Sequence, residues 1–394
     1  MDNKKEGEIE KWLREATKAG YSEDKIKELL KQGGYGDEGI KGVLEIRNQL
    51  KKKKKLSFNK PAPIVKRFGK VDDDVPEEIR EAYHLLSLTR DEVNKVVLGQ
   101  SETVDAFMCA LLCNGHVLLE GVPGIAKTLL VKTLAEASGC SSNRIQFTVD
   151  LLPSDILGMT TYTPEKGFET IKGPIFANFI IADEINRSPP KTQSAMIESM
   201  QERQVTIAKQ TYPLPKPFFV MANNNPLESS GVYDLPEAQV DRFLFKLVMG
   251  YPKKGEEVKI IEDNMTLKDF STFNVQPILS AEKIIEIQKI TLEQIYMDDK
   301  VKSYVVDIVD KTRKKDFEHG KYIEWGGSPR ASIGLFIASK AWALMNGRNY
   351  VIPQDVKDVA HYVLRHRIIL NYRARSEGIT SDTIISEILR MINV

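Results

Sequence analysis

The stretch from His116 to Leu130 carries residue types and a spacing that bind phosphate. An apolar run of strand length, 116–120, is followed by Gly-Val-Pro-Gly-Ile-Ala-Lys-Thr at 121–128. The apolar spacing after Thr128 predicts a helix, so the whole stretch is typical of strand, glycine-rich loop and helix. Backbone N–H groups from Gly124 to Lys127 would surround the phosphates, Lys127 would reach the β- and γ-phosphates, and Thr128 would bind Mg²⁺. An ordinary strand-turn-helix corner is the alternative.

Ala126 departs from the general pattern of such a loop, which has a second glycine at this position. A methyl group is acceptable there if the residue enters the helix with a negative φ. The loop alone therefore leaves both interpretations open, and the residues downstream favour the phosphate-binding one.

A second apolar run, 178–182, ends in two adjacent carboxylates, Asp183 and Glu184. ATP hydrolysis beside a phosphate loop needs such a pair. Asp183 would hold the Mg²⁺ shell, and Glu184 would polarise the attacking water. Taken alone, an acidic pair after a strand is often only its solvated end. Its place after a phosphate loop, with one predicted strand between them, favours the hydrolytic interpretation.

Three asparagines, Asn223, Asn224 and Asn225, follow a further buried strand at 217–222. An amide at the tip of this strand could orient the water or touch the γ-phosphate. Asparagine is also a common turn former, so a purely structural role is the alternative.

The composition indicates more than one domain and no strong charge bias. At 394 residues the chain exceeds one ordinary domain, so two or three cores are expected. Lys and Arg number 56 against 55 for Asp and Glu, which gives no support for a dedicated nucleic-acid-binding protein. The three cysteines have neither metal-site nor disulfide spacing, and Cys109 and Cys113 are expected in the core of one helix. Since no signal peptide or long apolar span is found, we expect a soluble, cytoplasmic protein.

Four segments are predicted along the chain. Residues 1–50 show three helical segments separated by Gly-Tyr turns, a pattern that resembles the ubiquitin-associated (UBA-like) type of helical domain. This part is either a partner-binding module or a simple N-terminal appendage. Residues 51–75, which begin with five lysines, predict a solvated linker, with a membrane-surface or RNA contact as the alternative. Residues 76–250 predict an α/β core with a parallel sheet, and 251–394 predict a smaller all-α domain.

Two segments of the core are expected to be insertions. Residues 151–176 are punctuated by glycine and predict a hairpin, and 204–214 alternate like a second hairpin with its turn near Lys209. Other core elements are expected as helices at 77–97 and 102–113 and strands at 144–149 and 244–249. In the last segment, helices are expected near 284–295, 304–309, 331–345, 355–364 and 383–391.

Together these pieces resemble the AAA+ ATPases, and specifically the MoxR family, from about Pro76 to the C-terminus. The resemblance rests on four stretches, the loop at 115–128, Asp-Glu-Ile-Asn-Arg-Ser-Pro-Pro-Lys-Thr-Gln at 183–193, Leu-Pro-Glu-Ala-Gln-Val-Asp-Arg-Phe at 235–243 and Gly-Ser-Pro-Arg-Ala at 327–331. Ala126 is usual in this family, so the alanine at the position of the second glycine supports the resemblance.

The resemblance implies a role for each matching residue. Lys127 and Thr128 bind the phosphates and the metal, Asp183 binds Mg²⁺, and Glu184 acts on the water. Asn225 takes the sensor-1 position, Arg242 is the arginine finger that reaches a neighbouring subunit's nucleotide, and Arg330 is the sensor-2 arginine. The residues expected to bind the nucleotide are Leu98, Gly99, Gln100, Gly121, Pro123, Gly124, Ile125, Ala126, Lys127, Thr128 and Leu129.

The resemblance also implies a function, an ATP-hydrolysing, chaperone-like remodeller that matures or activates partner protein complexes as a hexameric ring. Its cofactors would be ATP and Mg²⁺, its client could bear a von Willebrand factor A domain, and the two predicted insertions would couple to that client. A nucleic-acid-dependent motor is one alternative, opposed by the neutral charge. A metal-chelatase motor subunit is another. A nucleotide-dependent scaffold is the third, opposed by Glu184, because a scaffold needs no water-polarising carboxylate.

Overall fold

The computed structural model describes residues 75–121, 127–165, 167–224, 232–251 and 273–392, together with Lys27, Lys31, Gly255 and Glu257. The chain divides into two compact units, Met1–Val65 and Lys66–Val394, and the description below concerns the second. The predicted N-terminal module, the lysine-rich linker, residues 122–126 of the phosphate loop and the sensor-1 residue Asn225 lie outside the described residues. Among the helices of the described part, none combines the length and the apolar character that crossing a membrane requires.

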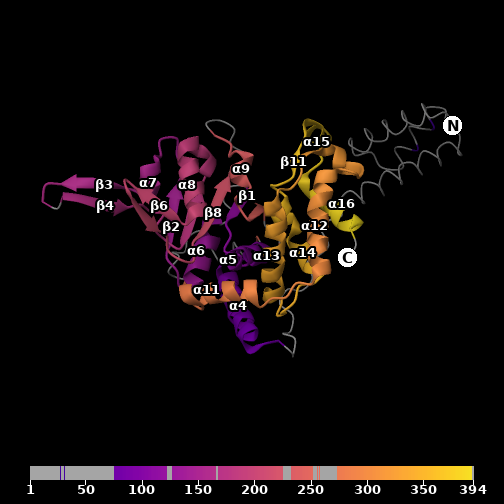
Figure 1. The fold of residues 1–394 in the computed structure, drawn as a ribbon, viewed down its shortest axis with the longest axis horizontal. Coiled ribbons are helices and arrows are strands. Elements are labelled where there is room, and N and C mark those ends of the chain that lie inside the picture. Colours follow the sequence, from indigo (N-terminus) through magenta and orange to yellow (C-terminus); the bar gives the residue numbers. More distant parts are fainter. Residues whose placement is uncertain are drawn as a thin grey trace. The chain divides into compact units, whose positions relative to one another are not determined.

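A five-stranded parallel sheet forms the centre of the second unit (Figure 1). Its strand order is β2–β5–β8–β1–β9. The strands are β1 (Val117–Gly121), β2 (Ser142–Gln146), β5 (Phe179–Asp183), β8 (Phe219–Asn224) and β9 (Phe245–Met249). Since all of them are parallel, their carboxyl ends lie along one edge of the sheet, where ligands bind in open α/β folds.

Both faces of this sheet are buried, which explains why its central strands are apolar at nearly every position. Along β5, Phe179 and Ile181 pack into one hydrophobic cluster, and Ile180 and Ala182 into another on the opposite face. The first face is covered by α4 (Glu77–Val96), α5 (Ser101–Leu112) and α6 (Lys127–Ala137). The second is covered by α7 (Pro153–Leu157) and α8 (Pro190–Glu202). The predicted α/β architecture with a parallel sheet is confirmed.

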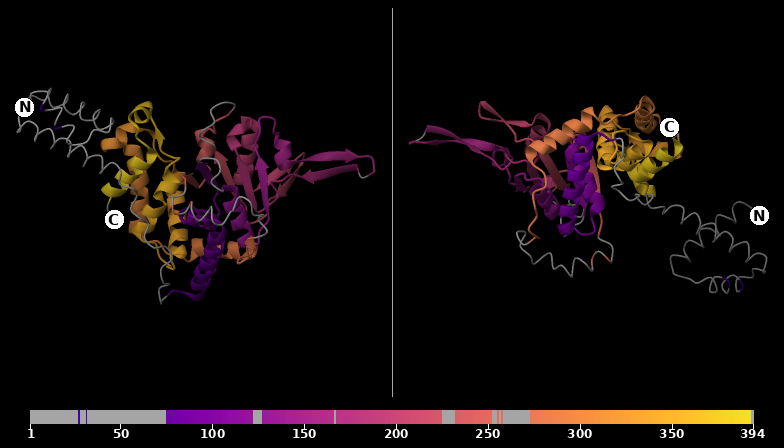
Figure 2. Two further views of the ribbon diagram at one scale, coloured as in Figure 1. Left: turned by 180° about the vertical axis from the view of Figure 1, so that it is seen from behind. Right: turned by 90° about the horizontal axis from the view of Figure 1, so that it is seen from below.

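Two antiparallel hairpins extend from the core, where the glycine and alternation patterns predicted them. One consists of β3 (Gly158–Thr163) and β4 (Gly167–Lys172), and the other of β6 (Gln204–Ile207) and β7 (Gln210–Pro213). The β3–β4 hairpin projects away from the sheet in all views (Figure 2). The Tyr212 hydroxyl of β7 donates a hydrogen bond to Thr170 of β4 at 3.2 Å, so the two hairpins are linked near their bases.

The C-terminal part is helical, as predicted, with one addition. Its helices are α11 (Ala281–Glu293), α12 (Asp299–Lys314), α13 (Pro329–Met345), α14 (Pro353–Leu364), α15 (Tyr372–Glu377) and α16 (Ser381–Met391). The sequence did not predict the short ribbon of β10 (Ile323–Trp325) and β11 (Ile369–Leu370). A strand of two or three residues is too short to show a periodicity, which is why the pattern missed it. The largest hydrophobic cluster runs from the sheet into these helices without a break.

Candidate active site

The carboxyl ends of four strands bring the residues of the candidate site to one edge of the sheet. The register pairs Gln146 of β2 with Asp183 of β5, and Glu120 of β1 with Asn224 of β8. The phosphate loop leaves β1 at this edge, and α6 begins there at Lys127. Residues that are far apart in the sequence therefore lie at the same edge of the sheet, among them Lys127, Asp183 and Glu184.

Asp183 is held by two neighbours, Asn223 of β8 and Arg144 of β2. Only 8% of its surface is exposed, and Asn223 donates a hydrogen bond to its Oδ1 at 2.5 Å. Arg144 of β2 forms an ion pair with Oδ2, with Nε at 2.9 Å and a second N–H also donating. A buried carboxylate needs such charged and polar partners, because burial without them would disfavour the ionised form. Both partners orient the carboxylate that is predicted to hold Mg²⁺.

Glu184 has a strained backbone and a well-defined side chain. Its φ of +57° and ψ of +49° place it in the left-handed region, which costs a residue other than glycine about 1–3 kcal/mol. Its backbone N–H donates to Asn223 Oδ1 at 2.6 Å, which helps to fix this conformation. The carboxylate Oε2 accepts from Gln146 Nε2 at 3.0 Å and pairs with Arg187 Nε at 3.0 Å. With 28% of the side chain exposed, the carboxylate is oriented but still accessible to water.

Lys127 lies half-buried at the start of α6. Its ammonium group donates to the Gly121 carbonyl oxygen at the end of β1. Burial lowers the pKa of Lys127, and the carboxylates of Asp183, Glu184 and Glu120 oppose that change. The charges of Lys127 and of the catalytic carboxylates therefore act on each other, as a site for phosphate and metal requires. Thr128 and Leu129 follow in the first turn of α6, both half-buried.

The oxygen donors at this edge fit a hydrated Mg²⁺ ion. Mg²⁺ prefers oxygen ligands and is usually bound through one or two protein oxygens, with water and substrate phosphates completing its shell. Asp183 supplies a carboxylate and Thr128 a hydroxyl at the helix start. Asn224 adds a buried Oδ1 that has no hydrogen-bond partner within the described residues. An acceptor of this kind, next to Glu120 in the register, is suited to a bound water or a ligand donor.

Leu98, Gly99 and Gln100 form the turn between α4 and α5. Gly99 has a φ of +72°, a conformation that favours glycine. Gln100 precedes α5, and its side-chain oxygen accepts from Thr103 at 3.2 Å. The structure explains these residues as a turn and a helix start, and their contact with the nucleotide remains a prediction.

The two arginines carried over from the resemblance lie outside the group around Asp183. Arg242 is exposed and follows α9 (Glu237–Val240), and no ion pair with another described residue holds its guanidinium. Arg330 is half-buried in the first turn of α13, where its backbone N–H donates to Ser328 Oγ at 3.2 Å. Their predicted roles concern a nucleotide and a neighbouring subunit, and both roles remain predictions.

Sequence reasoning missed two residues of this site, Arg144 and Gln146, and it gave no contact with Glu184 to Arg187, which it named only within the stretch 183–193. The predicted strand at 144–149 begins two residues too late, since β2 spans Ser142–Gln146. The correct bounds would have placed Gln146 at the end of its strand, next to the carboxylates. Asn223 was named only as one of three asparagines, because the resemblance gives the sensor-1 position to Asn225.

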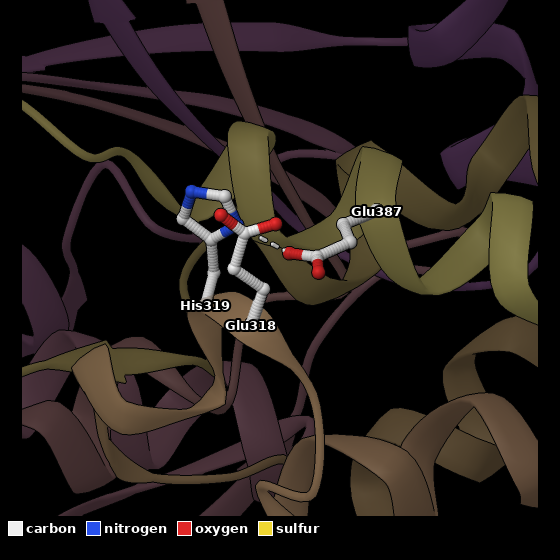
Figure 3. A group of neighbouring side chains, drawn as sticks. All are labelled: Glu318, His319 and Glu387. Atoms are coloured by element: carbon white, nitrogen blue, oxygen red, sulfur yellow. Dashed lines mark hydrogen bonds and ion pairs between the residues drawn. The ribbon is translucent and has the colours of Figure 1, made fainter. Parts of the chain in front are cut away.

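Within the described residues, the one cluster of three histidine and carboxylate side chains close enough to share a metal ion lies on other elements. Glu318, His319 and Glu387 meet where η3 (Glu318–Tyr322) contacts α16 (Figure 3). His319 Nδ1 and Glu387 Oε2 form a hydrogen bond of 2.5 Å, which accounts for their proximity. The group contributes nothing to the edge of the sheet described above.

Comparisons with known proteins agree with this geometry. Residues 116–245 match the family described as "ATPase family associated with various cellular activities (AAA)", and 317–388 match the AAA lid domain. Chaperone MoxR1 of Mycobacterium tuberculosis is 44% identical over 321 residues, which cover 80% of this chain and 84% of that protein. Protein MoxR of Paracoccus denitrificans is 30% identical over 306 residues, covering 73% of this chain and 90% of that protein. A solved structure of a candidate ATPase from Cytophaga hutchinsonii has a TM-score of 0.75 at 45% identity, covering 80% of this chain and 97% of that one. The chain therefore belongs to the MoxR family of AAA+ ATPases.

Proposed function

We propose that this protein hydrolyses ATP with Mg²⁺ and uses the energy to mature or activate partner protein complexes in the cytoplasm, where ATP is available. One observation carries the hydrolytic part. Glu184 lies at the end of β5, fixed by Asn223, Gln146 and Arg187, beside Asp183 and Lys127. A protein that only binds nucleotide has no need of an oriented, accessible carboxylate at this point. Membership of the family implies nucleotide binding, and one relative is named a chaperone.

In this proposal each residue has a defined task. Lys127 and the N–H groups of the loop hold the phosphates, and Thr128 and Asp183 hold Mg²⁺, which neutralises phosphate charge when bound. Glu184 accepts a hydrogen bond from the attacking water and so increases its nucleophilicity. Asn225, the residue that follows Asn224 in the sequence, would orient that water or contact the γ-phosphate.

The proposal further includes a homo-hexameric ring in which Arg242 completes the site of the next subunit. Its exposure supports this, because a guanidinium that serves a neighbour must be accessible in the isolated subunit. An arginine supplied in trans accelerates phosphoryl transfer by about 10³-fold or more.

The hairpins are the proposed contacts with the client, which could bear a von Willebrand factor A domain. Tyr162 and Phe168 face each other across β3 and β4, with ring centroids 5.1 Å apart. They are 63% and 80% exposed, although aromatic side chains are usually buried or at interfaces. An aromatic pair on a projecting hairpin is suited to bind apolar segments of another protein.

Mixing two inactive variants tests the hydrolytic proposal. Glu184→Gln removes the water-polarising carboxylate, and Arg242→Ala removes the finger, so each variant alone should bind ATP without turning it over. In rings that contain both, some Arg242→Ala subunits keep an intact Glu184 and receive an intact Arg242 from a Glu184→Gln neighbour. Those interfaces should recover ATPase activity. Mixed oligomers that remain inactive would contradict the trans role of Arg242. Arg187 would then become the next candidate for the arginine that stabilises the transition state.

Client binding needs a separate experiment, with the hairpin altered and the hydrolytic site intact. The ATP-loaded Glu184→Gln protein should retain client proteins in a pull-down, and adding Tyr162→Ser and Phe168→Ser should abolish this retention. Tyr372→Ser is the matched control, because Tyr372 is 81% exposed but lies on the helical domain. An equal loss of client retention in the Tyr372→Ser control would contradict the assignment of client binding to the hairpin.

If DNA stimulates the ATPase and salt removes the stimulation, a nucleic-acid motor is the better interpretation.

A further inference from the structure

The Asp241 carboxylate connects the arginine-finger segment with the helical domain. Ser328 Oγ donates to it, at 3.1 Å from Oδ2 and 3.3 Å from Oδ1. Arg367 Nε donates to Oδ1 at 2.8 Å. Asp241 immediately precedes Arg242, whereas both donors belong to the helical domain, so the residue beside the finger is bound from the opposite domain.

Arg367 holds the backbone on both sides of the finger as well. Its guanidinium donates to the carbonyl oxygens of Asp241 at 3.1 Å, Phe243 at 2.6 Å and Leu244 at 3.0 Å. Only 6% of the residue is exposed. A buried cation is strongly destabilising unless its N–H groups are paired, and here the turn 241–244 supplies most of the partners. Burial lowers the pKa of Arg367 to about 10, so the guanidinium stays charged at neutral pH.

Ser328 links the same carboxylate with the helix that carries Arg330. Its hydroxyl caps α13 by accepting from the Arg330 N–H at 3.2 Å, while it donates to Asp241. Gly334, one turn further along α13, allows α13 to pack closely against Val363 of α14, and it also lies beside Leu244 of the finger segment. A Cβ there would lie 3.4 Å from Leu244 Cδ1 and 3.0 Å from Val363 Cγ1. The start of α13 and the finger segment are therefore connected through the Ser328 hydroxyl.

We propose that Ser328 and Arg367 are positioning residues for Arg242, acting through Asp241, so that the placement of the helical domain decides whether the finger is in place in the next subunit. The proposal rests on the trans role of Arg242 given above. A lid that shifts when Arg330 meets nucleotide would shift Asp241 with it, since one hydroxyl binds both segments. One subunit's nucleotide state would thus reach the neighbouring site through these contacts.

Ser328→Ala tests this with little risk to the fold. It should lower kcat for ATP by about tenfold or more and leave the KM for ATP within about twofold, because a misplaced finger affects the transition state and not substrate binding. Ser280→Ala is the matched control for the lost cap, since Ser280 caps α11 by accepting from Lys283 N–H at the same 3.2 Å. Ser280→Ala should keep the parental kcat, and Ser328→Thr, which retains the hydroxyl, should restore most of it. An equal loss of kcat in Ser280→Ala and Ser328→Ala would overturn the proposal.

Mixed rings then separate a defect in trans from a defect in cis. Ser328→Ala subunits have an intact Glu184, so an intact finger from a Glu184→Gln neighbour should restore their turnover. If Arg242→Ala recovers in such mixtures and Ser328→Ala does not, the hydroxyl acts on its own subunit's site and the positioning proposal is wrong. If neither variant recovers, the trans role of Arg242 has failed and the inference fails with it.

Arg367→Lys gives an independent check on the second positioning residue. Lysine keeps the charge but cannot form the fork of contacts to the turn 241–244. We expect the same loss of kcat and the same recovery in mixed rings, provided that thermal unfolding shows an intact fold. A folded Arg367→Lys protein with parental kcat would remove Arg367 from the proposal and leave Ser328 alone to support it.

Discussion

The Asn223 side chain donates a hydrogen bond to Asp183 Oδ1 at 2.5 Å. Through its other atom, Oδ1, the same amide accepts from the backbone N–H of Glu184 at 2.6 Å. One residue of β8 therefore fixes the carboxylate proposed for the metal and the backbone of the one proposed for the water. The bridge fixes Asp183 and Glu184 relative to β8, which neither the acidic pair nor the run of asparagines indicates alone.

Asn223→Ala should lower kcat for ATP by about tenfold or more. The substitution removes two hydrogen bonds, one of them to a charged group, which is worth about 1.5–3 kcal/mol, and frees the strained backbone of Glu184. Titration with Mg²⁺ should also show weaker activation, because Asp183 loses a partner that orients it. Steady-state ATPase assays at several Mg²⁺ concentrations measure both effects. Asn143→Ala is the control, since it removes an exposed amide from β2, which β5 separates from β8. Parental kinetics in Asn223→Ala would show that the bridge has no catalytic importance.

Lys127→Ala should abolish ATP binding while the fold is retained. The ammonium group is held at the end of β1 by the Gly121 carbonyl, where it can neutralise phosphate charge. Calorimetry should detect no binding at concentrations that saturate the parent. Lys132→Ala removes an exposed lysine from the same helix and should bind ATP normally. Ordinary ATP affinity in Lys127→Ala would refute the assignment of the loop.

Removal of the N-terminal 71 residues should leave the ATPase rate comparable with that of the full chain. The reason is that every residue assigned to hydrolysis lies beyond residue 120, and α4, the first helix of the unit that contains the sheet, begins only at Glu77. Size-exclusion chromatography and an ATPase assay of the protein beginning at Asp72 test this. A truncated protein that assembles but is inert would make the N-terminal segment part of the machine.

Local patterns were sufficient for the elements but not for their mutual contacts. Strand-length apolar runs predicted β1, β5 and β8, and the alternation of 204–214 predicted β6 and β7. Arg144 and Asp183, in contrast, are 39 residues apart and meet only because β2 pairs with β5. No local pattern contains this strand order, so a contact that depends on it could not be predicted.

The contact between the α/β core and the helical domain through Arg367 could not be predicted for a similar reason. Arg367 lies beyond the helix expected at 355–364, in a stretch for which no element was predicted. In the structure it is buried against the turn 241–244, 123 residues earlier in the chain at Leu244. Buried arginines depend on partners from distant segments, and sequence periodicity carries no information about such partners.

Stability should fall steeply in mild acid because of His116. The imidazole is fully buried beneath β8, where its Nδ1 accepts from the Val220 N–H at 3.1 Å and its Nε2 lies 3.0 Å from the Met200 carbonyl oxygen. These partners require the neutral tautomer with hydrogen on Nε2. Burial lowers the pKa of His116 from 6.5 to about 4, with a smaller contribution from the charge of Arg203.

The direction of this pH dependence follows from the protonation of His116 in the folded and in the unfolded protein. Below pH 6.5 the unfolded chain takes up a proton at this residue, whereas the folded protein does so only near pH 4, so the free energy of unfolding decreases as the pH falls through this window. The decrease due to His116 should amount to about 3 kcal/mol. His116→Gln retains one donor and one acceptor but does not titrate, so urea unfolding between pH 7 and pH 4.5 should show a shallower decrease in the variant. His366, whose pKa burial also lowers, is present in both proteins and cancels from the comparison. Parallel pH dependences for the parent and His116→Gln would show that His116 is not the residue responsible.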